Sequence, residues 1–241
     1  MEKYVSSLII SFFIYGFAGW IWESFICPLM TGHKIKNSGF LNGPILPIYG
    51  VGALVVSLLF SPSESYLSIF IEGAFVACVI EYFTSWAMEA LYHRRWWDYD
   101  DKAFNVNGRV CLEGFLIFGL FSVIAVKFIQ PTLLSMIMVH GEVPLIMLAT
   151  ILCAILLVDL GITITTLANL EKRIDEFVRD AEEYAQRVLD GFEQGKKSII
   201  EILETIRLTD SSAYQEFLKQ KKFAEKRILK AFPALTNKKK K

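Results

Sequence analysis

Long apolar stretches alternate with short polar segments over the first 168 residues of the chain. Five stretches meet or approach the roughly 20 mostly apolar residues that a transmembrane helix needs. The pattern therefore predicts an all-α fold, a polytopic membrane helix bundle of about five spans. The predicted spans are residues 5–27, 44–61, 67–91, 111–130 and 144–168.

The hydrophobic pattern changes after the last predicted span. From Leu167 to Val188, apolar residues recur at steps of three and four, which is typical of one face of an amphipathic helix. We expect this helix to run directly out of the last span and to break at Gly191 and Gly195. Two further tail helices are expected, at 197–208 and 212–231.

The change of pattern divides the chain into a transmembrane helical domain, 1–168, and a cytosolic helical tail, 169–241. The apolar face of the first tail helix needs cover, because a soluble helix rarely leaves such a face in water. Another copy of the chain in a homo-oligomer, a helical partner binding 169–190, or the other tail helices would each supply it.

Composition supports the membrane class, because 54% hydrophobic residues and a mean hydropathy of +0.42 exceed what an ordinary soluble domain has. The basic loops, 28–43 and 92–110, and the basic tail alternate with two connectors, 62–66 and 131–143, that have no Lys or Arg. By the positive-inside rule, the N-terminus lies outside and the C-terminus in the cytosol of a multi-pass plasma-membrane protein.

Acidic residues inside or beside the predicted spans are candidates for function, because a charge deep in a bilayer costs about 2.5–3.5 kcal/mol on insertion scales. The 92–110 loop carries the opposite charge and further polar groups. Two interpretations stay open, an internal Arg–Glu network that fixes the helices and a ligand site or transport pathway. The candidates are Glu23, Glu81, Glu89, Glu113 and Asp159 on the spans, and Arg94, Arg95, Asp98, Asn105 and Arg109 in the loop.

Local patterns add three expectations around these residues. Gly16, Gly19 and Glu23 share one helix face, whose small residues favour close packing of that face inside the bundle. Asn107–Gly108 predicts a turn with positive φ that directs Arg109 toward the start of the next span. An aromatic belt at the membrane interface is the simplest interpretation of a cluster in the same loop, Trp96, Trp97 and Tyr99.

Several kinds of site have no support in the sequence. The motifs GxxxxGK[ST], HExxH and GxSxG are absent, and the four cysteines form no CxxC pair. We therefore expect no cofactor and no metal, and we do not expect this chain itself to be an enzyme. Nucleic-acid binding has no support beyond a short basic end.

Four stretches together resemble the ABC-transporter permease family called type IV. They are FFIYGFAGWIWES (12–24), GFLNGPILPIYGVGAL (39–54), EYFTSWAMEALYHRRWWDYDDKAFNVNGRVCLEG (81–114) and RILKAFP (227–233), of which the block around WWDY is the most specific. The resemblance implies a bacterial integral membrane protein that works with a separate ATP-binding subunit. It also implies importance for Glu23, Glu89, Trp96, Trp97, Asp98, Asn105, Gly108, Arg109 and Cys111.

Three functions are consistent with these observations. The first is the membrane permease of an ABC-type transporter without an ATPase of its own, with a polar site near the cytosolic face. The second is a membrane-embedded enzyme or binder of phosphorylated lipid headgroups at the inner leaflet, in which arginines hold phosphate. The third is a membrane scaffold or sensor that acts through its helical tail.

Overall fold

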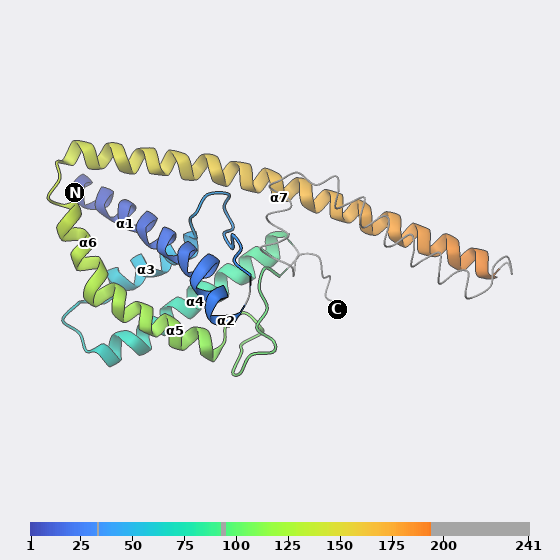
Figure 1. The fold of residues 1–241 in the computed structure, drawn as a ribbon, viewed down its shortest axis with the longest axis horizontal. Coiled ribbons are helices and arrows are strands. Elements are labelled where there is room, and N and C mark those ends of the chain that lie inside the picture. Colours follow the sequence, from blue (N-terminus) through green and yellow to red (C-terminus); the bar gives the residue numbers. More distant parts are fainter. Residues whose placement is uncertain (33, 93–94, 194–241) are drawn as a thin grey trace. The chain divides into compact units, whose positions relative to one another are not determined.

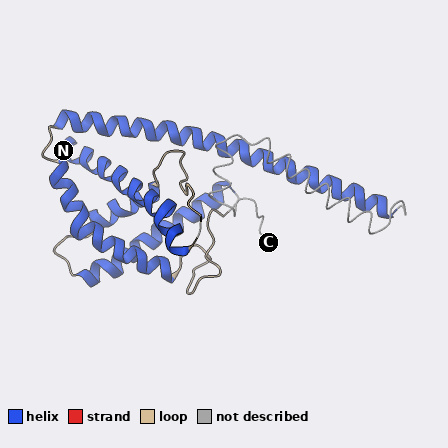
Figure 2. Cartoon of the chain, viewed as in Figure 1, coloured by secondary structure: helices blue, strands red, loops and turns tan. Residues whose placement is uncertain are grey.

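The structure is a computed structural model that describes residues 1–32, 34–92 and 95–193 (Figure 1). These residues form helices and loops, and no strand occurs among them (Figure 2). The all-α prediction is therefore confirmed for the described part of the chain. Two compact units are present there, Met1–Thr163 and 164–193, and each is described by itself.

Nine helical segments follow one another in the described residues, and some of them join end to end. Two of the segments, η1 and η2, are single π-helical turns inside longer helices. The segments are α1 (Glu2–Ile21), η1 (Trp22–Ile26), α2 (Cys27–Thr31), α3 (Pro47–Leu59), α4 (Tyr66–Tyr92), α5 (Leu112–Ile124), η2 (Ala125–Ile129), α6 (Gln130–Ile137) and α7 (Glu142–Glu193).

Four continuous helical runs are long and apolar enough to cross a membrane, namely Glu2–Thr31, Tyr66–Tyr92, Leu112–Ile137 and Glu142–Leu170. The remaining apolar helix, α3, has 13 residues and is therefore about 20 Å long, shorter than the roughly 30 Å hydrocarbon core of a bilayer. The polytopic bundle is confirmed, with four helices of spanning length and one shorter helix.

The predicted span 44–61 is wrong at its start, because the helix begins only at Pro47. Leu46 is extended, with φ −105° and ψ 101°, since a residue that precedes proline avoids helical backbone. Residues 34–46 thus reach the bundle as an irregular segment, which the glycines and prolines of this stretch permit.

Both π-helical turns stand directly before a segment whose second residue is proline. Pro28 is at the start of α2 and Pro131 at the start of α6. A wider π turn accommodates a residue that cannot donate a backbone hydrogen bond. The predicted connector 131–143 is therefore too long, because the helix continues through Pro131 to Ile137 and only 138–141 forms the turn.

Lys127 lies in η2, inside a helix and not at the end of a span as the shorter predicted span implied. Its ammonium donates to the carbonyl oxygens of Pro62 and Glu64 and lies 4.6 Å from the centre of the Tyr66 ring. This lysine therefore holds the short connector between α3 and α4 against the kinked helix.

Close packing of α1 against α3 depends on glycines, as the sequence predicts. A Cβ built on Gly16 would lie 2.7 Å from Ile45 Cγ2, and one on Gly19 would lie 2.3 Å from Tyr49 Cγ. Leu46 N also donates to the carbonyl oxygen of Gly16 at 2.9 Å. The face of α1 that bears these glycines, and that leads on to Glu23 in η1, therefore points into the bundle.

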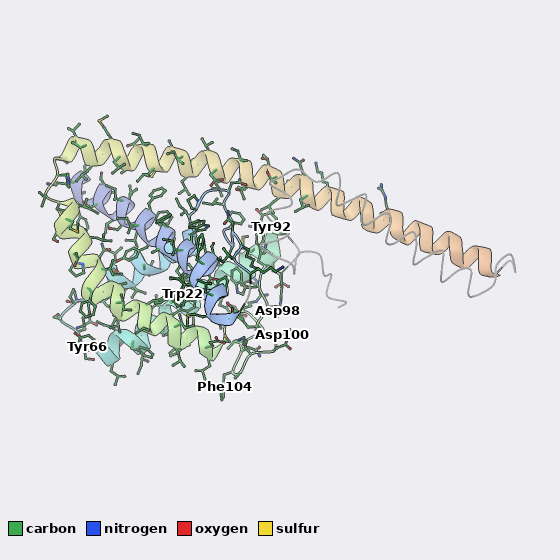
Figure 3. All side chains as sticks on the ribbon, viewed as in Figure 1. Trp22, Tyr66, Tyr92, Asp98, Asp100 and Phe104 are labelled. Atoms are coloured by element: carbon green, nitrogen blue, oxygen red, sulfur yellow. The ribbon has the colours of Figure 1, made fainter. Side chains whose placement is uncertain are left out.

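The two ends of the first unit differ in character (Figures 1 and 3). Tyr66 and the short connectors lie toward one end, which we call the connector end. Tyr92, Asp98 and Asp100 lie toward the other, which we call the loop end. Between the ends, many large apolar side chains are exposed, Phe75 and Ile155 among them, as a bilayer environment allows.

The second unit, in its described residues, consists of the continuation of α7. The helix runs on from the last apolar stretch as predicted, but the expected break at Gly191 is wrong because α7 includes this residue and extends to Glu193. Gly195 and the tail helices expected at 197–208 and 212–231 lie outside the described residues. The domain boundary at 168 stays a prediction.

Candidate functional site

An ion-pair network centred on Glu89 joins α4 to the loop that follows it. Glu89 Oε2 lies 2.7 Å from Arg109 Nη2 and 3.4 Å from Arg95 Nε. Arg109 also donates from Nη1 to Ser85 Oγ at 3.2 Å, and its guanidinium carbon lies 5.6 Å from the Tyr82 ring centre. With 11% of its side chain exposed, Arg109 is held in place by three residues on one face of α4.

The described residues 95–111 form a compact loop, called the 95–111 loop below, whose tip is a tight turn. Val106 N donates to Val110 O at 2.9 Å, and the turn between them has Asn107 at φ 53° and Gly108 at φ 63°. The predicted positive-φ turn at Asn107–Gly108 is confirmed. Asn107 Nδ2 donates to Tyr82 Oη, so the tip is also attached to α4.

Asn105 closes the loop on itself. Its Nδ2 donates to the carbonyl oxygens of Asp100 and Lys102, and its Oδ1 accepts from Gly108 N at 3.0 Å. Tyr99 N donates to Gly108 O across the loop at 2.8 Å. The amide of Asn105 therefore acts on the loop's own backbone, which is a positioning role.

Arg95 lies between the acid of α4 and two acids of its own loop. Its Nη1 is 3.2 Å from Asp98 Oδ1 and 3.5 Å from Asp100 Oδ1. Gly108 is packed against this cluster, since a Cβ built there would lie 2.6 Å from Arg95 Nη1 and from Asp98 Oδ1. The positive charges of Arg95 and Arg109 are thus largely neutralised by neighbouring carboxylates.

Two deeper carboxyl groups each accept a hydrogen bond from a tyrosine. Tyr49 Oη of α3 donates to Glu23 Oε1 at 2.6 Å, and Tyr99 Oη of the loop donates to Glu81 Oε1 at 3.2 Å. Burial raises the pKa of Tyr99 above its ordinary value, and the charges of Glu81 and Glu23 raise it further. Tyr99 therefore stays protonated and remains a donor to Glu81.

Glu113 takes a partner that the sequence interpretation did not assign to it. The predicted turn would direct Arg109 toward the start of α5, but Arg109 points to α4 because Glu89, Ser85 and Tyr82 all contact it there. Glu113 pairs instead with Lys102 at 2.7 Å, and its hydrogen bond raises the pKa of Lys102. Both side chains of this pair are more than half exposed.

Asp159 makes a different set of contacts from those of the acids on α1 and α4. Its Oδ1 accepts from the backbone N and from Nδ2 of Asn42, both at 3.0 Å, and its Oδ2 accepts from Gly43 N at 2.7 Å. Thr163 Oγ1 accepts a bond from Asn42 Nδ2 as well. Asp159 therefore fastens the irregular segment before α3 to α7, which is a structural role.

Trp96, Trp97 and Tyr99 of the loop all contact other parts of the protein, and the aromatic belt stays a prediction. Trp96 is 4% exposed, and its ring centre lies 5.3 Å from that of Phe40 and 5.7 Å from that of Tyr92. Trp97 Nε1 donates to the carbonyl oxygen of Arg109 at 3.1 Å. Trp96 and Tyr99 thus attach the loop to Tyr92 and Glu81 of α4, whereas Trp97 joins two parts of the loop to each other.

Most of the candidate residues therefore gather at the loop end, around the 95–111 loop, whereas Asp159 has its own tether and Arg94 lies outside the described residues. The partners that sequence reasoning missed include Tyr49, Tyr82, Asn42 and Lys102. An Asn–Gly pair before a proline marks the Asn42 turn in the sequence, but nothing marks Tyr49 as a partner of Glu23 or Tyr82 as a partner of Arg109.

An apolar groove of about 340 Å³ lies beside this network on the outer side of α4 and α5. Phe104 and Val106 of the loop line it together with Phe75, Phe83 and Phe115 of the two helices. Glu23, Glu81 and Glu89 are not part of its lining. The groove is therefore separate from the charged cluster, although Tyr82 and Cys111 border both.

Comparison with known proteins gives one family match. The model of the family described as "Putative ABC-transporter type IV" matches residues 10–164, which include every candidate residue of the site. No curated protein and no solved structure matches the chain. The match covers the helical unit together with the whole 95–111 loop, and it confirms the resemblance inferred from the sequence motifs.

Proposed function

We propose that this chain, a multi-pass membrane protein that belongs to the type IV family of ABC transporters, is the permease subunit of a transporter powered by a separate ATP-binding subunit. In this proposal the loop end faces the cytosol, as the distribution of Lys and Arg predicts. The 95–111 loop then closes the cytosolic end of the polar site.

The observation that supports a transport role is the pair of carboxyl groups inside the helix bundle beneath the loop. Glu81 is 7% exposed, and the loop covers it by means of Tyr99. Ionisable groups at such positions in membrane proteins line solute or ion pathways more often than they serve packing alone. A covered polar site that opens to one side of the membrane is what alternating access requires.

Closure of the site depends on the Arg109–Glu89 pair. Arg109 attaches the part of the loop that follows the Asn107–Gly108 turn to α4, by an ion pair, a hydrogen bond and a cation–π contact. A network of this kind has two discrete arrangements, paired and separated, so an ATP-binding subunit that contacts the loop end could shift the balance between them.

Purification from the native membranes tests the proposal. The tagged chain is isolated in a mild detergent, and co-purifying proteins that carry GxxxxGK[ST] are identified. The complex is then placed in vesicles, and ATP-dependent accumulation from a cell extract is measured by mass spectrometry. We expect an ATP-binding partner and ATP-dependent accumulation that the Arg109→Ala complex loses. The Lys102→Ala complex, with its exposed pair removed, should keep it.

Absence of any ATP-binding partner, or a complex that hydrolyses ATP without moving a solute, would contradict the permease proposal.

The second candidate, a binder of lipids at the inner leaflet, is favoured by the apolar groove, which suits an acyl chain. Its arginines already bind carboxylates, however, which leaves them less available to phosphate. Phospholipid that the purified chain retains and that Arg109→Ala loses would support this second candidate.

A further inference from the structure

Glu23 and Glu81 differ from the other acids of the loop end in having a tyrosine as partner instead of a base. Within the described part of the chain, no Lys or Arg lies within ion-pair distance of either carboxyl group. Glu89 and Glu113, by contrast, each have a basic partner at 2.7 Å. The tyrosine hydroxyls supply hydrogen bonds but no positive charge.

Glu81 is the more deeply buried of the two, and one of its carboxyl oxygens is left without a donor. Oε1 accepts from Tyr99, whereas Oε2 is buried and has no hydrogen-bond partner among the described residues. A Cβ built on Gly114 would lie 3.9 Å from Glu81 Oε2 and 3.8 Å from Cys111 Sγ. Oε2 therefore lies near Gly114 and the Cys111 thiol at the start of α5.

An ionised carboxylate is costly at such a position. Burial of an unpaired charge costs several kcal/mol or more, and buried carboxyl groups commonly become neutral instead. Addition of a proton to Oε2 removes the charge and leaves the Tyr99 hydrogen bond to Oε1 in place. At a deeply buried carboxyl oxygen that accepts no hydrogen bond, the protonated form is therefore favoured.

We propose that Glu81 is a proton-binding site, occupied while the 95–111 loop is closed and exchanged with the cytosol when the loop is released. The step forms one O–H bond at Oε2 and breaks one in a hydronium ion of the solvent, which becomes water; release reverses it, so no other reactant is needed. This inference rests on the proposed function, because it identifies a proton as a ligand of the transporter's polar site.

The neighbourhood of Glu81 favours exchange controlled by the loop. The nearby carboxylate of Glu23 disfavours a second negative charge, whereas the Tyr99 hydroxyl stabilises the ionised form. Tyr99 belongs to the loop that Arg109 attaches to α4, so movement of the loop replaces this single donor by water. Water molecules donate to both carboxyl oxygens, so they stabilise the ionised form more than the lost hydrogen bond did, and the proton is released. The titratable groups facing Glu81 are Glu23, Tyr49, Tyr99 and Cys111 from the packed elements, and Cys78 from α4 itself.

Infrared spectroscopy of the full chain in lipid nanodiscs tests the proposal directly. The C=O stretch of a protonated carboxylic acid is separate from the bands of a carboxylate, and it is followed as pH rises. We expect one such band at neutral pH in the wild-type protein and its loss in Glu81→Gln. Glu113→Gln serves as the control, because its exposed carboxylate should contribute no such band. Absence of the band in wild type, or its survival in Glu81→Gln, overturns the proposal.

Two further variants keep the test valid even if Glu81→Gln folds poorly. Arg109→Ala releases the loop, and the titration midpoint of the band should fall by about one pH unit, a tenfold loss of proton affinity. Gly114→Ala places a methyl group against Oε2 without a clash and keeps water out, so the midpoint should rise. Midpoints that are unchanged in both variants would contradict control by the loop.

The outcome of this experiment is separable from that of the transport experiment. Nanodiscs contain the chain without an ATP-binding subunit, so the carboxyl band is measured whether or not the permease proposal holds. If the band titrates as expected but no ATP-binding partner is found, the proton site at Glu81 is supported and the permease proposal is contradicted. ATP-driven transport in a chain without the band would do the reverse.

Discussion

Replacement of Gly19 by alanine is expected to destabilise the protein by about 3 kcal/mol, at the upper end of what overpacking of an interior costs. The new methyl carbon would lie 2.3 Å from Tyr49 Cγ and 2.5 Å from Tyr49 Cβ, atoms close to the backbone of α3 that cannot swing away. The two helices have to separate, and the Tyr49–Glu23 hydrogen bond is lost with them. Denaturant titration in mixed micelles measures the free energy of unfolding.

Gly52→Ala is the matched control for this substitution. Gly52 lies on α3, three residues after Tyr49, and a Cβ built there meets no atom within 4 Å. Alanine at this position should be neutral or stabilise the helix by about 0.5–1 kcal/mol, the ordinary gain over glycine. Equal effects of the two substitutions would show that close contact between α1 and α3 is not what Gly19 provides.

Removal of the Arg109 side chain has the second large expected effect. Arg109→Ala leaves Glu89 with only its longer contact to Arg95 and leaves Ser85 without a donor, so we expect a loss of about 3 kcal/mol, as for a buried pair that loses one partner. Arg109→Lys should recover only part of this, because an ammonium cannot reproduce the planar contacts of a guanidinium.

Lys102→Ala is the control, since it removes an ion pair of the same 2.7 Å length from an exposed position. Exposed pairs contribute up to about 1 kcal/mol, so this variant should unfold close to wild type. If Arg109→Ala proved as stable as Lys102→Ala, the Glu89 network would not be what fixes the loop.

Much of the fold could be predicted from the sequence, because a membrane restricts the choices. The length of the apolar stretches predicts where the membrane helices lie, and the small residues Gly16 and Gly19 indicate which face of α1 packs inward. Two of the errors come from prolines, and a third from Gly191, which does not break α7. The helix α3 begins only at Pro47, later than predicted. Pro131, by contrast, does not end its helix, because the wider π turn before it accommodates a residue that has no backbone N–H to donate.

For the candidate site, the sequence indicates which residues belong to it but not which of them pair with one another. Depth along a span indicates which acids come near the loop, and Asn107–Gly108 fixes the turn. The assignment of partners depends on rotation of helices about their axes, which sequence periodicity fixes too coarsely. Arg109 consequently lies on α4 instead of at the start of α5, and Glu23 and Glu81 have tyrosine partners that no sequence pattern indicated.

Cys111 offers the most direct measurement of the central claim, that the 95–111 loop is a cytosolic cover fixed by Arg109 and released during ATP-driven transport. Its thiol is 6% exposed at the end of this loop, so a variant that keeps only this cysteine reports on opening. A membrane-impermeant maleimide is added to inside-out vesicles that contain the chain and its ATP-binding subunit. The account predicts slow labelling at rest, several-fold faster labelling with ATP, and fast labelling without ATP in Arg109→Ala. One labelling rate in all three conditions would contradict it.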